Sequence, residues 1–188
     1  MSSELQATSR TGGHVFWLFG LSGAGKSTLA TALIADLRAH GIPVLALDGD
    51  ALRAGLCRGL GFSDADRAEN LRRAAEAAKL GAASGLCVVA SFITPLESHR
   101  ALVAAILGPR TASFIHVSAP LEVCRARDPK GLYARAQVGQ VAQLTGVSSA
   151  FEAPQQVDLV LNTAQESVAA AAAKLCRFAN DRLGLPNS

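Results

Sequence analysis

Residues 20–28 read Gly20-Leu21-Ser22-Gly23-Ala24-Gly25-Lys26-Ser27-Thr28, which matches the pattern G-x-x-x-x-G-K-[ST]. An apolar run of strand length, 14–19, precedes the stretch, and a segment of helical period, 26 to about 40, follows it. Glycines let the backbone turn its N–H groups toward a phosphate, and the helix N-terminus adds partial positive charge. The stretch therefore predicts a nucleotide-phosphate loop, in which Lys26 reaches the β- and γ-phosphates and Ser27 ligates Mg²⁺.

On both sides of this loop, apolar runs of strand length alternate with longer segments of helical period. That rhythm indicates repeated βα units around a parallel sheet. We predict an α/β protein with a P-loop NTPase fold, whose central parallel sheet of about five strands is flanked by helices. Further strands are expected at 43–47, 86–92, 113–117 and 157–161, and long or short helices at 65–83, 96–107, 120–127 and 165–182.

The alternation breaks between residues 128 and 154, where Gly, Gln, Ser and Thr surround scattered apolar residues. Such a segment is too long for an idle loop in a compact domain and is typical of an active-site lid. The chain has 188 residues, the length of one domain, and its hydrophobic fraction of 49% suffices for one core. We expect a flexible arm at 1–13 and a single P-loop domain at 14–184, with the lid at about 128–154.

Charge and cysteine usage restrict the partners and the compartment. The net charge of +3 is small for this length, so nothing global indicates nucleic acid. Residues 1–13 lack the apolar core of a secretory signal, and no apolar stretch approaches a membrane span. The four cysteines are far apart, with no Cys-x-x-Cys pair, as expected for buried thiols. The sequence thus predicts a cytoplasmic protein that binds neither nucleic acid nor membrane.

Two carboxylates, Asp48 and Asp50, directly follow the predicted strand 43–47. Strand ends of this type face the crevice where open α/β sheets bind ligands. We assign Asp48 to Mg²⁺ and Asp50 to the acceptor hydroxyl, which it would orient or deprotonate during transfer, so that both join Lys26 as candidate catalytic residues. The alternative is a solvated Asp-Gly-Asp turn.

A dense group of guanidinium side chains comes next in the chain, at Arg53, Arg67 and 72–73, together with Phe62 and Asn70. Arg67 and Asn70 are three residues apart and share a helical face. A guanidinium fork suits a sulfate or phosphate group, and the ring of Phe62 can pack on a base. The alternative of plain surface charge is strongest for the pair 72–73.

Besides the phosphate loop, the chain contains a series of ordered motifs, which are Trp17-Leu18, Leu47-Asp48-Gly49-Asp50, Leu60-Gly61-Phe62-Ser63, Asp66-Arg67-Ala68-Glu69-Asn70, Ser91-Phe92-Ile93-Thr94-Pro95, Arg127-Asp128-Pro129-Lys130-Gly131-Leu132-Tyr133, Thr145-Gly146 and Glu152-Ala153-Pro154. In these motifs, from about Val15 to Thr163, the chain resembles one family, the adenylylsulfate kinases. The resemblance implies ATP- and Mg²⁺-dependent phosphorylation of the 3′-hydroxyl of adenylyl sulfate, giving 3′-phosphoadenylyl sulfate and ADP, the second step of sulfate activation.

Carried over by position, the resemblance also implies roles for single residues. Arg127 would lie beside the ATP base, and the lid with Lys130 would cover both nucleotides. Phe62 and Phe151 would lie near the adenine of adenylyl sulfate. The residues implied to hold that substrate are Asp50, Arg53, Phe62, Arg67, Asn70, Ile93, Thr94, Lys130, Leu132 and Phe151.

Thr94 is the main departure, because bacterial members commonly place there a serine that can be phosphorylated. Threonine keeps the hydroxyl, but its β-branch restricts the rotamer. Two routes therefore stay open: transient phosphorylation of Thr94 followed by transfer to the substrate, or direct transfer from ATP to the substrate, which we prefer. A third alternative is that Thr94 is only a strand-end residue before Pro95. Residues 96–100 also depart from the family pattern, with only Arg100 matching well.

Other functions remain as alternatives. A kinase of the same architecture acting on gluconate, shikimate or a nucleoside-type metabolite is the nearest, although Phe62, Arg67 and Asn70 favour a nucleotide-like anion. A nucleotide-dependent regulatory protein is another, although the chain lacks the Asn-Lys-x-Asp element of GTP readers. The family resemblance also raises a homodimer and an association with ATP sulfurylase, for which the sequence shows no interface.

Overall fold

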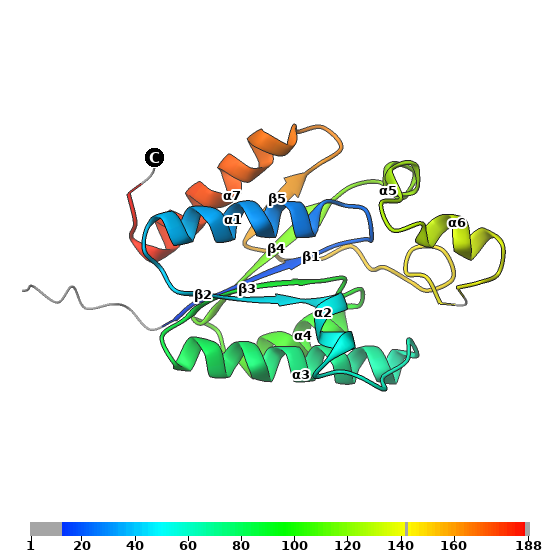
Figure 1. Ribbon diagram of the computed structural model, residues 1–188, viewed down its shortest axis with the longest axis horizontal. Coiled ribbons are helices and arrows are strands. Elements are labelled where there is room, and N and C mark those ends of the chain that lie inside the picture. The colour runs from blue at the N-terminus through cyan, green and yellow to red at the C-terminus, as the bar shows by residue number, and fades with distance from the viewer. Residues whose placement is uncertain (1–12, 142, 187–188) are drawn as a thin grey trace, which may run out of the picture.

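The structure is a computed structural model that describes residues 13–141 and 143–186. The arm predicted at 1–13 therefore lies outside the described residues, except for Gly13. Five parallel strands form one sheet in the order β2-β3-β1-β4-β5, which confirms the predicted α/β fold (Figure 1). Their bounds are β1 Val15–Phe19, β2 Val44–Asp48, β3 Cys87–Phe92, β4 Ala112–Ser118 and β5 Leu159–Asn162.

Helices cover both faces of the sheet. Figure 1 shows α1 (Lys26–Ala39) and α7 (Val168–Leu183) on one face, and α3 (Asp64–Ala83) and α4 (Glu97–Leu107) on the other. Three shorter helices, α2 (Gly49–Ala54), α5 (Leu121–Arg127) and α6 (Leu132–Gln137), lie among the loops. Helix α6 lies inside the predicted lid, where the sequence pattern indicates no helix, because six residues are too few to show a period.

Strand β1 is the centre of the sheet, and its five residues are fully buried. Phe16 and Leu18 pack into the core beneath α1 and α7, while Trp17 and Phe19 pack into the core beneath α3 and α4. A strand covered on both faces must be apolar at every position, because successive side chains point to opposite faces. This is why the run before the phosphate loop reads as continuously apolar.

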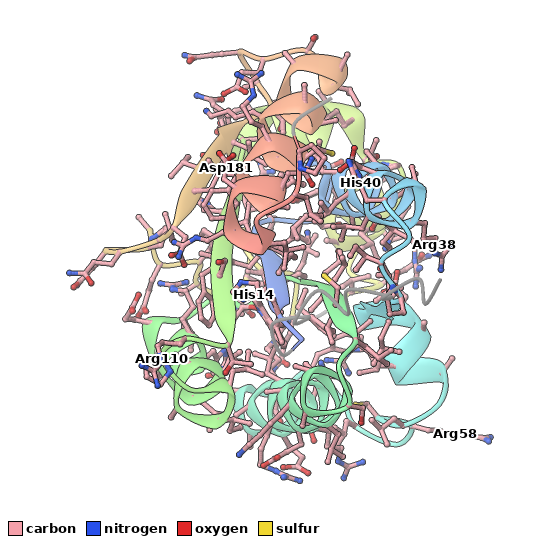
Figure 2. All side chains as sticks on the ribbon, turned by 90° about the vertical axis from the view of Figure 1, so that its left-hand side faces the viewer. His14, Arg38, His40, Arg58, Arg110 and Asp181 are labelled. Atoms are coloured by element: carbon pink, nitrogen blue, oxygen red, sulfur yellow. The ribbon has the colours of Figure 1, made fainter. Side chains whose placement is uncertain are left out.

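All carboxyl ends of the strands lie at one edge of the sheet, because the strands are parallel. The phosphate loop, α2, α5 and α6 gather at this edge, on the right-hand side of Figure 1. Figure 2 views the molecule from the opposite edge, where Arg38 and His40 lie at the end of α1 and His14, Arg58 and Arg110 come from other parts of the chain. Within residues 13–141 and 143–186, no helix is long and apolar enough to cross a membrane.

Candidate functional site

The loop between β1 and α1 needs glycine for two reasons. Gly20 has φ 151°, and a Cβ there would lie 2.2 Å from the carbonyl oxygen of Val117. Gly23 has φ 78°, and its Cβ would lie 2.8 Å from the carbonyl oxygen of Cys124. Side chains other than hydrogen would therefore clash with backbone while adopting a left-handed conformation. Glycine lets the loop pack tightly against the neighbouring chain.

Lys26 is the first residue of α1, and its Nζ donates a hydrogen bond to the carbonyl oxygen of Leu21 at 2.8 Å. Burial, followed by the nearby charge of Lys130, lowers the pKa of Lys26 to about 8. A cation in this position gains from any anion that enters, because the anion offsets the lost hydration. The geometry agrees with a phosphate-binding lysine.

A cavity of about 1000 Å³ opens at the carboxyl edge of the sheet, which is the upper end of the usual range for ligand pockets. The phosphate loop forms one wall, and residues of α2, α3 and the loop after β3 form the other. The structure brings together at this cavity the predicted residues Ser22, Gly23, Gly25, Lys26, Ser27, Thr28, Asp48, Asp50, Arg53, Phe62, Arg67, Asn70, Ile93, Thr94, Arg127, Lys130 and Leu132.

Four predicted residues do not line the cavity. Gly20, Leu21 and Ala24 belong to the phosphate loop itself, but they are buried and do not line the cavity. Phe151 stacks on His116, with ring centroids 5.9 Å apart, and packs against both halves of the core. Phe151 does not line the cavity in this structure, because its ring packs beside His116 and against the core, and its place near the adenine of adenylyl sulfate stays a prediction.

The two carboxylates at the end of β2 differ in their surroundings. Asp48 accepts hydrogen bonds from the backbone N–H groups of Asp50, at 3.0 Å, and Ala51, at 3.4 Å, and so caps α2. The side chain of Asp50 is 70% exposed and forms an ion pair with Lys130 of the lid segment. Each of the two carboxylates therefore has a defined partner, whereas in a solvated Asp-Gly-Asp turn both would contact only water.

Ser27 and Asp48 line the same cavity, and their hydroxyl and carboxylate oxygens could hold magnesium there. The part of the chain that the structure describes holds no group of three or more His, Cys, Asp or Glu suited to a metal ion. Magnesium commonly binds through one or two carboxylates together with substrate phosphates and water. One carboxylate and one hydroxyl therefore fit a magnesium ion that arrives with a nucleotide.

The other wall of the cavity is built around Phe62, whose ring is 55% exposed. The guanidinium of Arg53 lies 4.4 Å from the ring centroid and donates to the carbonyl oxygen of Gly61. Arg67 is buried and donates to the carbonyl oxygens of Phe62, at 2.9 Å, and Gln143, at 2.7 Å. Burial and the charge of Arg53 lower the pKa of Arg67, so an anionic ligand would stabilise both cations.

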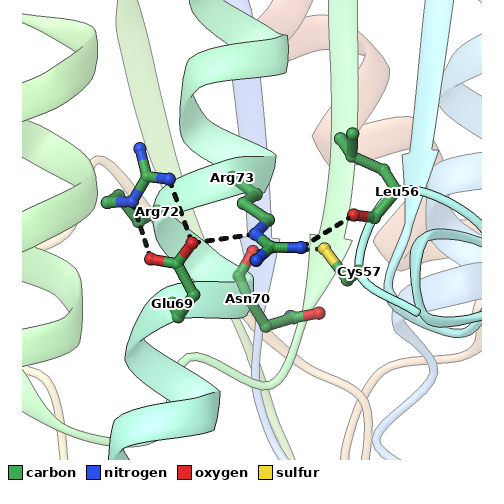
Figure 3. A network of polar contacts seen from close by, with 6 residues as sticks. All are labelled: Leu56, Cys57, Glu69, Asn70, Arg72 and Arg73. Atoms are coloured by element: carbon green, nitrogen blue, oxygen red, sulfur yellow. Dashed lines mark hydrogen bonds and ion pairs between the residues drawn. The ribbon is translucent and has the colours of Figure 1, made fainter. Parts of the chain in front are cut away.

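Arg72 and Arg73 do not line the cavity, and Figure 3 shows both of them bonded to Glu69. Both donate to the carboxylate of Glu69, and Arg73 also donates to the carbonyl oxygen of Leu56. The surface-charge alternative thus describes these two residues. Asn70, in the same view, lines the cavity, and its Oδ1 is buried without a hydrogen-bond partner among the described residues. A buried free acceptor in a cavity wall suits a ligand N–H group.

Sequence reasoning missed Thr163, which follows β5 and lines the cavity. Its Oγ1 donates to the carbonyl oxygen of Ala24 at 2.7 Å and accepts from Arg127 at 3.1 Å. Thr163 thereby joins the phosphate loop to the start of the lid. Its only sequence signal is its place at the end of a parallel strand, where ligands commonly bind.

Fold and site together define a P-loop phosphotransferase, that is, a kinase. We call the side of its cavity formed by residues 20–28 the donor wall, and the side built around Arg53, Phe62, Arg67 and Asn70 the acceptor wall. The model of the family described as adenylylsulphate kinase matches residues 12–162. An adenylyl-sulfate kinase of Shewanella amazonensis is 47% identical over 176 residues, covering 94% of this chain and 89% of the relative. One from Aeromonas hydrophila is 50% identical over 156 residues, covering 83% of this chain and 79% of the relative.

Among solved structures, the Mycobacterium tuberculosis APS kinase CysC in complex with AMPPNP and APS is similar. It has a TM-score of 0.86 and 40% sequence identity, covering 90% of this chain and 98% of that one. The chain belongs to the adenylylsulfate kinase family.

Proposed function

We propose that the protein transfers the γ-phosphate of ATP to the 3′-hydroxyl of adenylyl sulfate, giving 3′-phosphoadenylyl sulfate and ADP. One observation carries the proposal: a single cavity joins the phosphate loop to the wall of Arg53, Phe62, Arg67 and Asn70. Donor and acceptor could therefore meet in line without leaving the protein. The names of the relatives supply the identity of the acceptor.

On the donor side, Lys26 pairs with the transferring phosphate, and the loop 20–28 cradles the β-phosphate through its N–H groups. Arg127 lies beside the ATP base, with Thr163 fixing its guanidinium. Ser27 and Asp48 would hold magnesium, which would offset the negative charge of the nucleotide phosphates.

On the acceptor side, Asp50 accepts the proton of the 3′-hydroxyl or orients it. Lys130 pairs with Asp50 in this structure. When the substrates bind, its ammonium group pairs with their anionic groups instead. Phe62 packs on the adenine, and Arg53 and Arg67 bind the phosphosulfate. Ile93, Thr94 and Leu132 complete the wall, and direct transfer is the preferred route over a phosphorylated Thr94.

The lid gives this site protection from water. Tyr133 of α6 is buried, and its hydroxyl donates to the carbonyl oxygen of Ser22 in the phosphate loop at 3.0 Å. Asp128 accepts from the N–H groups of Tyr133 and Ala134, which caps α6. A lid anchored in this way limits the loss of γ-phosphate to hydrolysis.

The test is an assay with ATP, Mg²⁺ and adenylyl sulfate, followed by identification of the 3′-phosphorylated product. Gluconate, shikimate and a nucleoside serve as competing acceptors. Equal or better turnover of any of these would contradict the assignment. A regulatory protein would instead bind a nucleotide and turn it over slowly whatever acceptor is added.

We propose further that the protein works in the cytoplasm as a homodimer. The free thiols Cys57, Cys87 and Cys124 are buried, which agrees with a reducing compartment. Light scattering of the purified protein measures its mass in solution and tests the dimer. Co-purification with ATP sulfurylase tests the separate idea of an association between the two enzymes.

A further inference from the structure

The lid segment is held at its two ends by different parts of the protein. Its start is joined to the donor wall, because Arg127 binds Thr163 and Thr163 binds the phosphate loop. Its end is joined to the loop that follows β3: the N–H of Glu152 donates to the carbonyl oxygen of Pro95 at 2.9 Å. Pro95 lines the acceptor side of the cavity.

Glu152 also caps a helix that lies far away in the sequence. Helix α4 begins at Glu97, and the residue before it, Leu96, offers no side-chain cap. The carboxylate of Glu152 accepts a hydrogen bond from the N–H of Glu97 at 2.6 Å. A carboxylate at this position satisfies a free N–H group and interacts favourably with the positive end of the helix.

Arg100 completes the connection from inside α4. Its side chain is 5% exposed, and Nη1 donates to the carbonyl oxygens of Thr94, at 3.1 Å, and Pro95, at 3.2 Å. Nη2 donates to the carbonyl oxygen of Glu152 at 3.1 Å, and the guanidinium also pairs with the carboxylate of Glu97. One buried cation therefore ties the acceptor wall, α4 and the end of the lid together.

The residue held in this way is strained. Thr94 has φ 43°, a left-handed conformation that is unfavourable for a β-branched residue and persists only where the surroundings enforce it. Its hydroxyl accepts a hydrogen bond from the indole of Trp17 at 3.0 Å, and Arg100 holds its carbonyl group. Thr94 lines the cavity, whereas neither Arg100 nor Glu152 does.

We propose that Arg100 and Glu152 are positioning residues for the acceptor: they join the end of the lid to the strained wall at Thr94 and keep that wall in its binding shape. The inference rests on the proposed function, since it concerns the adenylyl sulfate side of the same cavity. If the wall spends only a fraction of its time in the binding shape, the apparent affinity for the acceptor falls by that fraction. ATP keeps its affinity, because the donor wall is held independently through Arg127 and Thr163.

The experiment compares Glu152→Ala with Glu152→Gln and with a matched control, Asp158→Ala. Asp158 is also a carboxylate that accepts from a distant backbone N–H, that of Phe114 at 2.8 Å, and pairs with an arginine, Arg182. It does not line the cavity. The steady-state KM for adenylyl sulfate, the KM for ATP and the melting temperature are measured for each protein.

Loss of a helix cap corresponds to about a fivefold change in an equilibrium constant, here that between the binding and non-binding shapes of the acceptor wall. Glu152→Ala should therefore raise the KM for adenylyl sulfate by about fivefold. The KM for ATP should stay near the wild-type value. Glu152→Gln keeps an oxygen acceptor and should restore most of the acceptor affinity. Asp158→Ala should lower the melting temperature while leaving both KM values unchanged.

A second variant, Arg100→Lys, keeps a buried cation but loses the planar fork, and should also raise the KM for adenylyl sulfate selectively. An unchanged KM for adenylyl sulfate in Glu152→Ala and Arg100→Lys, or an equal rise in both KM values, would overturn the inference. If wild-type protein gives no 3′-phosphorylated product, the proposed function fails instead, which separates the two results.

Discussion

The donor wall and the acceptor wall of the cavity are built in different ways. The donor wall is largely one stretch, 20–28, whose glycines and lysine lie next to one another in the chain. The acceptor wall combines α2, α3, the loop after β3 and the lid, and its Arg67 reaches across 76 positions to the carbonyl oxygen of Gln143. A contiguous loop depends on local backbone geometry, whereas an assembled wall depends on long-range contacts that hold each part in place.

This difference predicts that single substitutions act differently on the two walls. A change in the donor wall should remove transition-state charge stabilisation and lower the rate. A change in the acceptor wall should lower acceptor affinity and leave ATP binding alone. Four experiments, ordered by expected size, test that division.

Lys26→Ala should have the largest effect. Removal of one preorganised cation from the transferring phosphate costs about 3–4 kcal/mol, so the rate should fall roughly a hundredfold or more. Single-turnover measurements with saturating substrates report the loss. Lys79→Ala, which removes an exposed lysine of α3, is the control and should behave as wild type. A rate for Lys26→Ala within about tenfold of wild type would remove the phosphate loop from the mechanism.

Arg67→Ala should weaken adenylyl sulfate binding by about 1.5–3 kcal/mol, the range for a hydrogen bond to a charged group. ATP affinity should stay near normal, because Arg67 donates to the carbonyl oxygens of Phe62 and Gln143 on the acceptor wall. Equilibrium titration of each ligand measures the two affinities. Arg72→Ala is the matched control, since Arg72 pairs with Glu69 on the surface. Equal losses for both ligands would show that the walls are not independent.

The pH dependence should sharpen the description of the donor wall. Burial and the charge of Lys130 lower the pKa of Lys26 from 10.5 to about 8, so in the free protein this lysine is charged below that pH and neutral above it. Because ATP needs the charged form, kcat/KM for ATP should fall as pH rises through about 8, while kcat holds to higher pH since bound phosphate stabilises the cation. The arginine in Lys26→Arg stays charged, so this variant should not show the fall in kcat/KM for ATP above about pH 8. If the fall in kcat/KM persists in Lys26→Arg, it reports the titration of a side chain other than Lys26.

Thr94→Ala should have the smallest effect on turnover, about fivefold, the value of one ordinary hydrogen bond. Trp17 donates to the hydroxyl of Thr94, and among the described residues no carboxylate or imidazole is bonded to it to remove its proton. Direct transfer therefore remains the prediction. Incubation with labelled ATP should leave no phosphoprotein in the wild type, whereas collapse of turnover in Thr94→Ala with label in the wild type would establish the relay.

Fold class and donor wall were predictable because their signals are local. The apolar run of β1 and the glycines at 20 and 23 follow from packing on two faces and from backbone space, and both are visible in consecutive residues. Asp48, Asp50 and Arg67 were also predictable as cavity residues, since strand ends and helix faces are periodic features. The short helix α6 was not, because six residues show no period.

Consecutive residues and their periods thus determined the parallel sheet and the phosphate loop, and the ordered motifs carried the resemblance to the family. Only the tertiary structure decided that Phe151 packs on His116 beside the core, that Thr163 joins the phosphate loop to the lid, and that Glu152 caps a helix 55 positions away. The reason is physical: a hydrogen bond or a ring contact between distant segments depends on where the whole sheet places them, and no local pattern records that position.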